Sequence, residues 1–403
     1  MHDVVVVGGG PAGCHTAALL GQKGFDVHVF EEHPVIGEPV DCSGVIGAEA
    51  FATLELPESL RLGEIRTLTL VSPSQLEVRF SPPSPLAYIV DRAAFDRTIA
   101  DKASRSGATF HLGSTVVDLQ VLKECVEVVF KEIINAPRST VHGQRSLVNG
   151  QKTLKASMVI LAGGPRYGIQ LKLGMGQPGD FLRTAQAEVA VRGVEEARVL
   201  MGSSVAPGSF GWIVPFRRGG NDFARIGVSA KTSPVPYLRK LIHNLYDTGY
   251  LSSSNVPVRS WVIPIAPLPR TFADRVLAVG DAAGQTKPTS GGGIFYGLLC
   301  AEAAVHSVVA AFERGDFSLG TLSRYEEEWR KKLGREIRIA AFFRRLAERL
   351  TDKDIDDLFR IVQSDGILSA VTSKAHFDWH GDVIFFTLRH PGLGRIFLKG
   401  LFG

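Results

Sequence analysis

A carboxylate and a glycine-rich turn stand together in residues Gly280–Gly297, which read GDAAGQTKPTSGGGIFYG. An apolar run, Val276–Val279, ends directly before them, and a helical pattern begins within them. A strand that ends at an acidic residue, followed by a turn and a helix, places the carboxylate and several free backbone N–H groups around a ligand. The candidate ligand contacts are Gly280, Asp281, Gly291, Gly292, Gly293 and Ile294.

A second glycine-rich turn lies at the N-terminus. Val4–Val7 predicts a buried parallel strand, and the pattern Gly-x-Gly-x-x-Gly follows at once. In this pattern the first glycine permits a tight turn, the second lets the backbone approach a pyrophosphate, and the third lets the helix pack on the strand. The candidate contacts are Gly8, Gly10, Pro11, Ala12 and Gly13. Two such turns, nearly the whole chain apart, suggest one long cofactor that spans both, which points to FAD.

An acidic residue follows the second predicted strand, Phe25–Phe30. Such a residue, about 20 positions after the glycine turn, can bind ribose hydroxyls. Glu31 and Glu32 compete for this role, and Glu31 is preferred because it comes directly after the apolar residues. An arginine at this position would favour a ribose phosphate, and the sequence has no arginine there.

The composition indicates a globular protein of two or three domains. The chain has 403 residues, of which 45% are hydrophobic and 21% charged, and its net charge of +4 is too small to argue for nucleic acid. Four scattered cysteines without a CxxC pair imply neither a zinc site nor a disulfide framework, so no metal is expected and a reducing, cytoplasmic compartment fits. The first strand begins at the N-terminus, so no signal peptide is expected, and no uninterrupted apolar run reaches the length needed to span a bilayer.

The order of predicted elements indicates an α/β protein, α+β overall. A Rossmann-like cofactor domain is expected over residues 1–165, discontinuous with 270–320. An antiparallel-sheet substrate domain is inserted at 166–269, and a helical region follows at 321–403. Within the first domain, 61–80 alternates as antiparallel strands, Asp91 is a candidate N-cap of a helix over Asp91–Ser106, and 131–156 suggests a polar hairpin.

Certain segments resemble the geranylgeranyl reductase family of flavoproteins, within the larger group shaped like p-hydroxybenzoate hydroxylase. They are GGGPAG at Gly8–Gly13, EPVDCSG at Glu38–Gly44, FGWIVP at Phe210–Pro215 and GDAAGQTKPTSGGGI at Gly280–Ile294. The resemblance covers roughly residues 1–330. Its two middle segments are typical of the reductases, whereas the first and last are shared across the larger group. The chain departs from the family at Gly163, where many relatives carry Asp, and at Phe216, which intervenes before a basic residue.

The resemblance implies a role for several side chains. Asp281 is expected on the ribityl chain of FAD, and Arg92 near its phosphates, although a surface arginine is the alternative. Cys42 is expected near the flavin and the substrate double bond, where a thiol could help deliver a proton; an ordinary buried cysteine is the alternative. The residues expected to line the substrate cavity are Phe210, Trp212, Pro215 and Tyr296.

The implied activity is hydrogenation of C=C bonds in a polyprenyl lipid or diphosphate by hydride from reduced FAD. NADPH or ferredoxin would be the electron donor. One alternative is an FAD-dependent monooxygenase of an aromatic or terpenoid molecule, and a second is a prenyl-binding chaperone of the Rab escort kind. The tail Phe385–Gly403 mixes apolar residues, among them Phe402, with arginines and a lysine, so it either contacts a membrane surface peripherally or docks on the protein. The oligomeric state is left open.

Overall fold

The N-terminal valine run is a central strand of an eight-stranded sheet in the computed structural model, which describes residues 1–132, 150–364, 366–374 and 376–402. The strand order is β17-β18-β11-β1-β2-β8, and β10 and β9 continue from β11. The central strands are parallel, whereas β9, β10 and β17 pair antiparallel. Their bounds are β1 (His2–Val7), β2 (Val27–Glu31), β8 (Thr109–Leu112), β9 (Ser114–Val121), β10 (Val126–Glu132), β11 (Lys152–Leu161), β17 (Phe272–Ala273) and β18 (Val276–Ala278).

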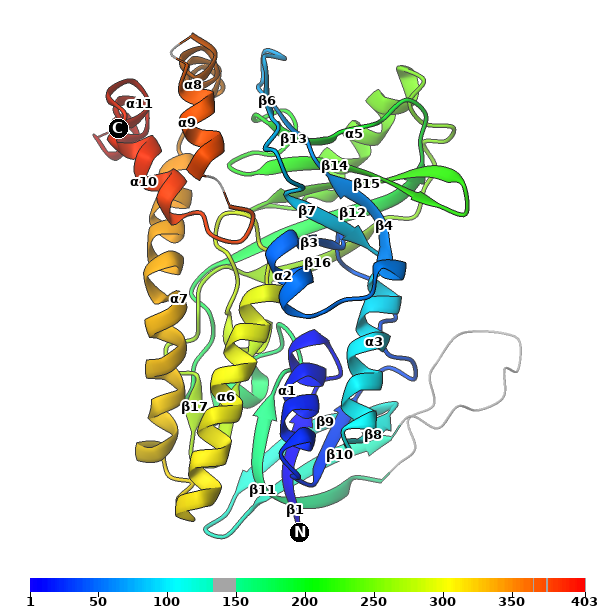
Figure 1. The fold of residues 1–403 in the computed structure, drawn as a ribbon, viewed down its shortest axis with the longest axis vertical. Coiled ribbons are helices and arrows are strands. Elements are labelled where there is room, and N and C mark those ends of the chain that lie inside the picture. The colour runs from blue at the N-terminus through cyan, green and yellow to red at the C-terminus, as the bar shows by residue number, and fades with distance from the viewer. Residues whose placement is uncertain (133–149, 365, 375, 403) are drawn as a thin grey trace.

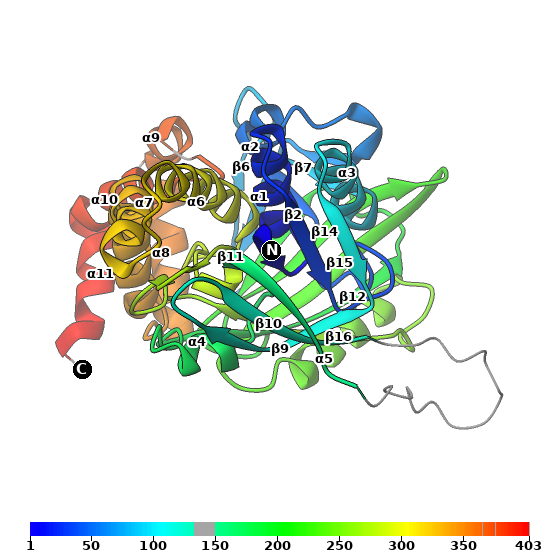
Figure 2. The ribbon, with the colours of Figure 1, turned by 90° about the horizontal axis from the view of Figure 1, so that it is seen from below.

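The valines of β1 are buried on both faces of this sheet. Val4 and Val6 belong to a core cluster with residues of α1 (Pro11–Gln22), α3 (Arg92–Arg105), α6 (Ile294–Arg314) and α7 (Leu319–Ala347). Val5 belongs to the cluster on the other face, with residues of β10 and α4 (Gly168–Lys172). Figure 2 shows α1 and α3 on one side of β11, with β9, β10 and α4 on the other. Covering both faces explains the unbroken apolar run.

A second sheet has the order β16-β12-β15-β14-β13-β5-β6 and is antiparallel except between β13 and β5. Its bounds are β5 (Leu68–Val71), β6 (Glu77–Phe80), β12 (Phe181–Ala190), β13 (Ala197–Met201), β14 (Phe210–Arg218), β15 (Asn221–Ala230) and β16 (Arg259–Pro264). The helix α5 (Val235–Asp247) packs on it. This sheet takes β5 and β6 from the segment assigned to the cofactor domain, so strands from both sides of residue 165 pair; the predicted domain boundaries stay a prediction.

A small antiparallel sheet lies between the larger two. It contains β3 (Val45–Gly47), β7 (Ala87–Val90) and β4 (Arg61–Ile65), and is flanked by α2 (Ala48–Thr53) and a short 3-10 helix, η1 (Glu58–Leu60). β7 leads directly into α3, where Asp91 accepts a hydrogen bond from Ala94 N–H at 3.0 Å. The predicted N-cap of this helix is therefore confirmed.

Helices form the C-terminal part of the described chain. α8 (Asp352–Ser364), α9 (Ile367–Lys374), α10 (Gly381–Arg389) and α11 (Pro391–Phe402) gather at one end of α7, beside the second sheet (Figure 1). The expected fold class is therefore confirmed: a Rossmann-like unit, a largely antiparallel sheet and a C-terminal helical region. Of the predicted hairpin 131–156, residues 133–149 lie outside the described part.

Among the described residues, α6 is the one helix long and apolar enough to span a membrane by length and composition, although Glu302 and His306 interrupt its apolar run. Of its most apolar window, 72% is buried inside the protein. Its apolar residues pack against β1, α1 and α7, which accounts for their composition.

Candidate active site

The first glycine-rich turn joins β1 to α1 and leaves space over the start of the helix. A Cβ atom on Gly8 would lie 2.5 Å from the Ala162 carbonyl oxygen, and one on Gly13 would lie 2.1 Å from the Gly8 carbonyl oxygen. Gly10, by contrast, has no described atom within 4 Å of its Cβ position and lines a cavity of 1280 Å³. A pyrophosphate can therefore approach the first N–H groups of α1 on the side of Gly10.

The acidic candidates at the end of β2 both line this cavity but are held differently. Glu31 accepts hydrogen bonds from Gly9 N–H at 2.7 Å and from His33 N–H at 2.9 Å. Glu32 pairs with the exposed Arg166. The Glu31 carboxylate thus lies across the glycine turn, which agrees with the preference for it, and its ribose contact stays a prediction.

The second glycine-rich turn lies directly against the first. The Cβ position of Gly280, whose φ is +64°, is 3.0 Å from the Ala12 Cβ atom, and that of Gly297 is 3.4 Å from the same atom. Small residues therefore let α1, α6 and the turn after β18 meet. One ligand can touch both turns only because of this proximity.

Buried polar groups hold the second turn from behind. Gly280 N–H donates to Gln285 Oε1 at 2.9 Å, Gln285 Nε2 donates to the Tyr325 hydroxyl at 2.8 Å, and this hydroxyl donates to the last carbonyl of β18 at 2.6 Å. The Tyr167 hydroxyl donates to the Asp281 carbonyl at 2.8 Å. The roles of Tyr167 and Tyr325 were missed in the sequence because both residues are distant from the turn along the chain and form no local motif with it.

Asp281 lines the cavity, and within the described residues its carboxylate receives no hydrogen bond. Its Oδ1 atom lies 2.6 Å from the Cβ position of Gly293, so a larger residue there would displace the carboxylate. Burial raises the pKa of Asp281 to about 6, and the charge of Arg92 lowers it in part. The carboxylate is thus free to accept hydrogen bonds from ligand hydroxyls, although its ribityl contact stays a prediction.

The glycine run before α6 is held by the backbone of Lys287. Lys287 N–H donates to the Gly292 carbonyl at 3.0 Å, and Gly291 N–H donates to the Lys287 carbonyl at 2.8 Å. Gly293 is the N-cap of α6, and Ile294, its first residue, lines the cavity. The positive end of the helix dipole therefore lies at the cavity wall.

Arg92 is buried at the start of α3 and lines the same cavity as Cys42. Its Nη2 donates to both carboxylate oxygens of Asp96, at 2.8 and 3.0 Å, whereas its Nε has no hydrogen-bond partner among the described residues. Arg92 is therefore not a surface arginine. Its guanidinium charge at the cavity wall suits an anionic ligand group.

The second sheet holds the loop of Cys42. Trp212 Nε1 donates to Gln186 Oε1 at 3.1 Å, and Gln186 Nε2 donates to the Cys42 carbonyl at 3.2 Å. Arg225, which is 2% exposed, donates to the Ser43 carbonyl at 2.7 Å. Neither Gln186 nor Arg225 was predicted from the sequence, although a polar residue inside an otherwise apolar strand was an available signal.

The expected substrate residues divide into two groups. Phe210 and Trp212 line the cavity, with ring centroids 6.0 Å apart. Pro215 does not line it, because side chains alternate along β14 and residues 210, 212 and 214 share the other face. Tyr296 does not line it either; it is 1% exposed in the core, and its hydroxyl donates to the Asp378 carbonyl at 3.2 Å.

Beyond Trp212 the cavity continues as an apolar channel between the second sheet and the C-terminal helices. Aliphatic and aromatic side chains of both form its walls, including Leu70, Val78, Val199, Met201, Leu358, Phe359, Leu393 and Phe397. The channel therefore extends from the glycine loops to α11.

The segment before α10 covers the glycine loop. Lys287 Nζ lies 2.7 Å from Asp378 Oδ1, and His380 Nδ1 lies 2.6 Å from Thr289 Oγ1. His380 Nε2 must carry the proton that reaches the Phe377 carbonyl at 2.9 Å, so Nδ1 accepts from the threonine. Burial lowers the pKa of His380 to about 4, which keeps the ring neutral.

These residues fit a dinucleotide cofactor. The turn is open at Gly10, the Asp281 carboxylate receives no hydrogen bond from a described residue, and the charged side chain of Arg92 lines the same cavity. Ribityl hydroxyls and phosphates offer the matching groups.

Family models match two parts of the chain. A model described as an NAD(P)-binding Rossmann-like domain matches residues 6–41, and one described as lycopene cyclase protein matches residues 111–365. The chain is 30% identical over 381 residues to a digeranylgeranylglycerophospholipid reductase of Methanothermobacter thermautotrophicus, covering 91% of this chain and 93% of the relative. It is 28% identical to such a reductase of Methanococcoides burtonii, covering 89% and 86%.

Solved structures share the fold. A geranylgeranyl bacteriochlorophyll reductase-like protein from Thermoplasma acidophilum superposes with a TM-score of 0.82 at 20% identity, covering 99% of both chains. A p-nitrophenol 4-monooxygenase from Pseudomonas putida superposes with a TM-score of 0.69 at 17% identity, covering 93% of this chain and 97% of that one. At these identities the likeness shows the fold alone.

Proposed function

The chain belongs to the family of the digeranylgeranylglycerophospholipid reductases, within the wider group that the lycopene cyclase protein model describes, and from this we propose that it binds FAD and reduces C=C bonds of a prenyl lipid. The substrate is a geranylgeranyl-type lipid or diphosphate. The electron donor is NADPH or ferredoxin.

The observation that carries this proposal is the continuity of the cavity. One space of 1280 Å³ contacts both glycine-rich turns, Cys42 and Trp212, and then runs between apolar side chains as far as α11. A channel of this length and polarity suits a flexible hydrocarbon chain, whereas a compact polar substrate would need anchoring groups deeper inside.

When bound, FAD supplies the hydride that one alkene carbon accepts. The chain itself must exclude water, hold the alkene and provide a proton for the other carbon. Trp212 and Phe210 border the space between the glycine loops and the channel, where they can position the double bond. Cys42 lines the same space, and its Sγ atom accepts from Gly44 N–H at 3.4 Å, which orients the thiol. We therefore assign Cys42 as the proton donor.

The reaction is tested by reconstituting the protein with FAD, reducing it chemically with dithionite and adding a geranylgeranyl lipid. Mass spectrometry of the lipid distinguishes the candidate activities. A gain of two hydrogen atoms for each reduced bond supports the proposal. A gain of one oxygen atom indicates hydroxylation, an unchanged mass with altered retention indicates isomerisation such as ring closure, and an unchanged lipid that stays bound indicates a carrier; each of these overturns it.

The role of Cys42 is tested separately with Cys42→Ser and Cys42→Ala. A hydroxyl can still donate a proton whereas a methyl group cannot, so reduction by Cys42→Ala is expected to fall about 10²-fold and that by Cys42→Ser less. Equal rates in both variants at unchanged FAD content would assign the proton to water instead.

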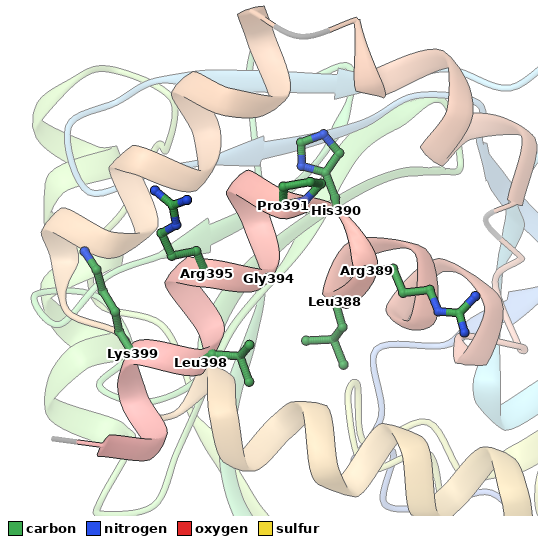
Figure 3. A pocket seen from close by; sticks show the side chains of 8 residues that line it. All are labelled: Leu388, Arg389, His390, Pro391, Gly394, Arg395, Leu398 and Lys399. Carbon is green, nitrogen blue, oxygen red and sulfur yellow. The ribbon is translucent and has the colours of Figure 1, made fainter.

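A peripheral membrane contact through α10 and α11 forms part of the proposal. Phe385 and Leu398 are each 46% exposed, and Arg389 stacks on Phe385 at 4.0 Å. A surface pocket of 420 Å³ separates the two helices; Figure 3 shows Leu388 and Leu398 at this opening, with Arg395 and Lys399 on one side of α11. Apolar residues beside cations suit anionic lipid headgroups.

α11 also connects this surface to the channel, because Leu393 and Phe397 line the cavity while Arg395 and Lys399 lie at the surface pocket. Of the tail, the side chain of Phe402 and residue 403 lie outside the described part. Co-sedimentation with phosphatidylglycerol vesicles is expected to be lost in Phe385→Ser/Leu398→Ser and retained in Tyr246→Ser, a matched exposed residue on α5. Equal binding by both variants would refute contact through α10 and α11.

A further inference from the structure

Two histidines and an aspartate meet where β1 and β2 begin, at the end of the sheet that carries the N-terminus in Figure 1. His2 Nδ1 lies 2.7 Å from Asp26 Oδ2, and His28 Nε2 lies 3.3 Å from Asp26 Oδ1. One ligand atom from each residue lies within 4.8 Å of the other two. In residues 1–132, 150–364, 366–374 and 376–402 this is the one group that brings three such donors together.

Backbone pairing holds these side chains in place. Val4 N–H donates to the Asp26 carbonyl at 3.1 Å, and Asp26 N–H donates to the Asp3 carboxylate at 2.9 Å. β1 and β2 then run parallel from Val4 opposite Val27. The donors of both strands therefore sit on a rigid part of the sheet, which a metal site requires.

A third histidine fixes the ring of His28. His28 Nδ1 lies 2.7 Å from Nε2 of His111 on the neighbouring strand β8, and His111 stacks on Phe30 with ring centroids 4.4 Å apart. The Nδ1 atom of His28 is thus occupied and its Nε2 atom is turned toward Asp26. Histidine ligands of metals are oriented in this way, by a partner on the other ring nitrogen.

We propose that His2, Asp26 and His28 form a zinc site, with His111 as the residue that positions His28. Two donors about 2.1 Å from a tetrahedral ion stand about 3.4 Å apart. The 3.3 Å between His28 Nε2 and Asp26 Oδ1 already matches this separation. His2 Nδ1 lies 2.7 Å from the other oxygen, Oδ2, so the His2 ring and the carboxylate must shift for all three side chains to bind one ion. Two imidazoles and a carboxylate favour zinc over magnesium or calcium and leave one position for water.

Solvent can deliver the ion, because the side chains of His2 and Asp26 are 32% and 53% exposed. None of the three ligands lines the large cavity. The strands they join carry Gly8 and Glu31 at their other ends, so zinc would tie the beginning of the cofactor-binding unit together rather than take part in the reaction. Zinc is therefore expected to stabilise the folded protein by mass action.

The site is tested on protein without an affinity tag, after treatment with EDTA. Titration with Co²⁺ is expected to give saturable visible bands of a tetrahedral N/O complex at one ion per chain, and Zn²⁺ should displace them. Zn²⁺ should also raise Tm relative to EDTA. Non-saturable binding or no change in Tm would overturn the proposal, whatever the FAD content or reductase activity.

Variants locate the ion. His2→Ala and Asp26→Asn are expected to weaken Zn²⁺ binding at least 100-fold, and Asp26→Asn can keep its hydrogen bond to His2. His111→Phe keeps the stacking on Phe30 and removes the nitrogen, so a 10–100-fold loss is expected. His306→Ala, which alters an exposed histidine paired with Glu328, is the control and should bind as the parent protein does. Parent-like binding by correctly folded His2→Ala and Asp26→Asn would place the ion elsewhere and overturn the proposal.

Discussion

Lys287 and Asp378 form an ion pair across 91 residues of sequence, with Nζ 2.7 Å from Oδ1 and side chains only 6% and 4% exposed. Lys287 belongs to the loop that leads into the glycine run, and Asp378 belongs to the segment that precedes α10. The pair therefore couples the C-terminal helices, which form one wall of the channel, to the loop on which the cofactor is expected to rest.

Removing one member of this pair leaves a buried charge without its partner. Asp378→Ala is expected to lower the free energy of unfolding by about 3–5 kcal/mol, whereas Lys287→Met/Asp378→Leu should cost much less. Urea denaturation measures both. Asp118→Ala, which breaks an exposed pair with Lys172, is the control and should cost at most about 1 kcal/mol. Equal losses for Asp378→Ala and the double variant would show that packing rather than charge accounts for the effect.

Gly10 and Gly13 are expected to separate cofactor binding from folding. Gly10→Ala adds a methyl group where no described atom lies within 4 Å, so stability without FAD should change by less than about 0.5 kcal/mol. FAD affinity should fall at least tenfold, because the methyl group faces the pyrophosphate. Gly13→Ala places its methyl group 2.1 Å from a carbonyl oxygen and should destabilise the protein itself. Flavin absorbance per chain and thermal unfolding provide the readouts, and undiminished FAD retention by Gly10→Ala would contradict the site.

Gln186 links Trp212 to the Cys42 loop through two hydrogen bonds. Gln186→Leu leaves the indole N–H and the loop carbonyl without this partner and should cost about 1–3 kcal/mol. In a double-mutant cycle with Trp212→Phe, the coupling energy should lie between about 0.5 and 3 kcal/mol. If the two substitutions changed the free energy of unfolding additively, the hydrogen bond between Gln186 and Trp212 would contribute nothing to stability.

The buried ring of His380 is expected to make the stability of the C-terminal segment sensitive to acid. Burial lowers its pKa from 6.5 to about 4 in the folded protein, so the unfolded chain binds more protons between these values. Above pH 6.5 the neutral ring does not lower the free energy of unfolding. As the pH falls toward 4, this free energy decreases by at most about 3 kcal/mol, which corresponds to the difference between a pKa of 6.5 and one of about 4. His380→Asn should flatten this part of the stability–pH curve, whereas the exposed control His306→Asn should not. Parallel curves for parent and His380→Asn would contradict the assignment.

Val199 borders the channel, and a larger side chain there should shorten the space for the substrate. Val199→Trp is expected to lower kcat/KM for a geranylgeranyl substrate about tenfold more than for a geranyl substrate, because only the longer chain must pass this point. Val262→Trp, at a 36% exposed position on β16, should leave the ratio unchanged. An equal loss of kcat/KM for both substrates in Val199→Trp would mean that the hydrocarbon chain of the substrate does not pass Val199.

The sequence by itself determined both glycine-rich turns, the strands before them and the N-cap at Asp91. These features are local: a Gly at a turn, an apolar strand and a capping carboxylate are set by residues a few positions apart. Phe210 and Trp212 could be placed on one face for the same reason, because alternation along a strand is a local rule. The same rule puts Pro215 on the opposite face of the strand, so the prediction that it lines the cavity was wrong.

Only the tertiary structure decided the contacts that join distant segments. Examples are the hydrogen bonds from Gln186 and Arg225 to the Cys42 loop, the position of Tyr325 behind Gly280, and the pairing of Asp378 with Lys287. Each depends on the packing of whole elements, and no local pattern encodes these contacts. The same holds for Tyr296, whose ring packs into the core although its neighbour Phe295 lines the cavity. Burial gives these polar groups their importance, because an unpaired donor or charge is costly only once water is excluded.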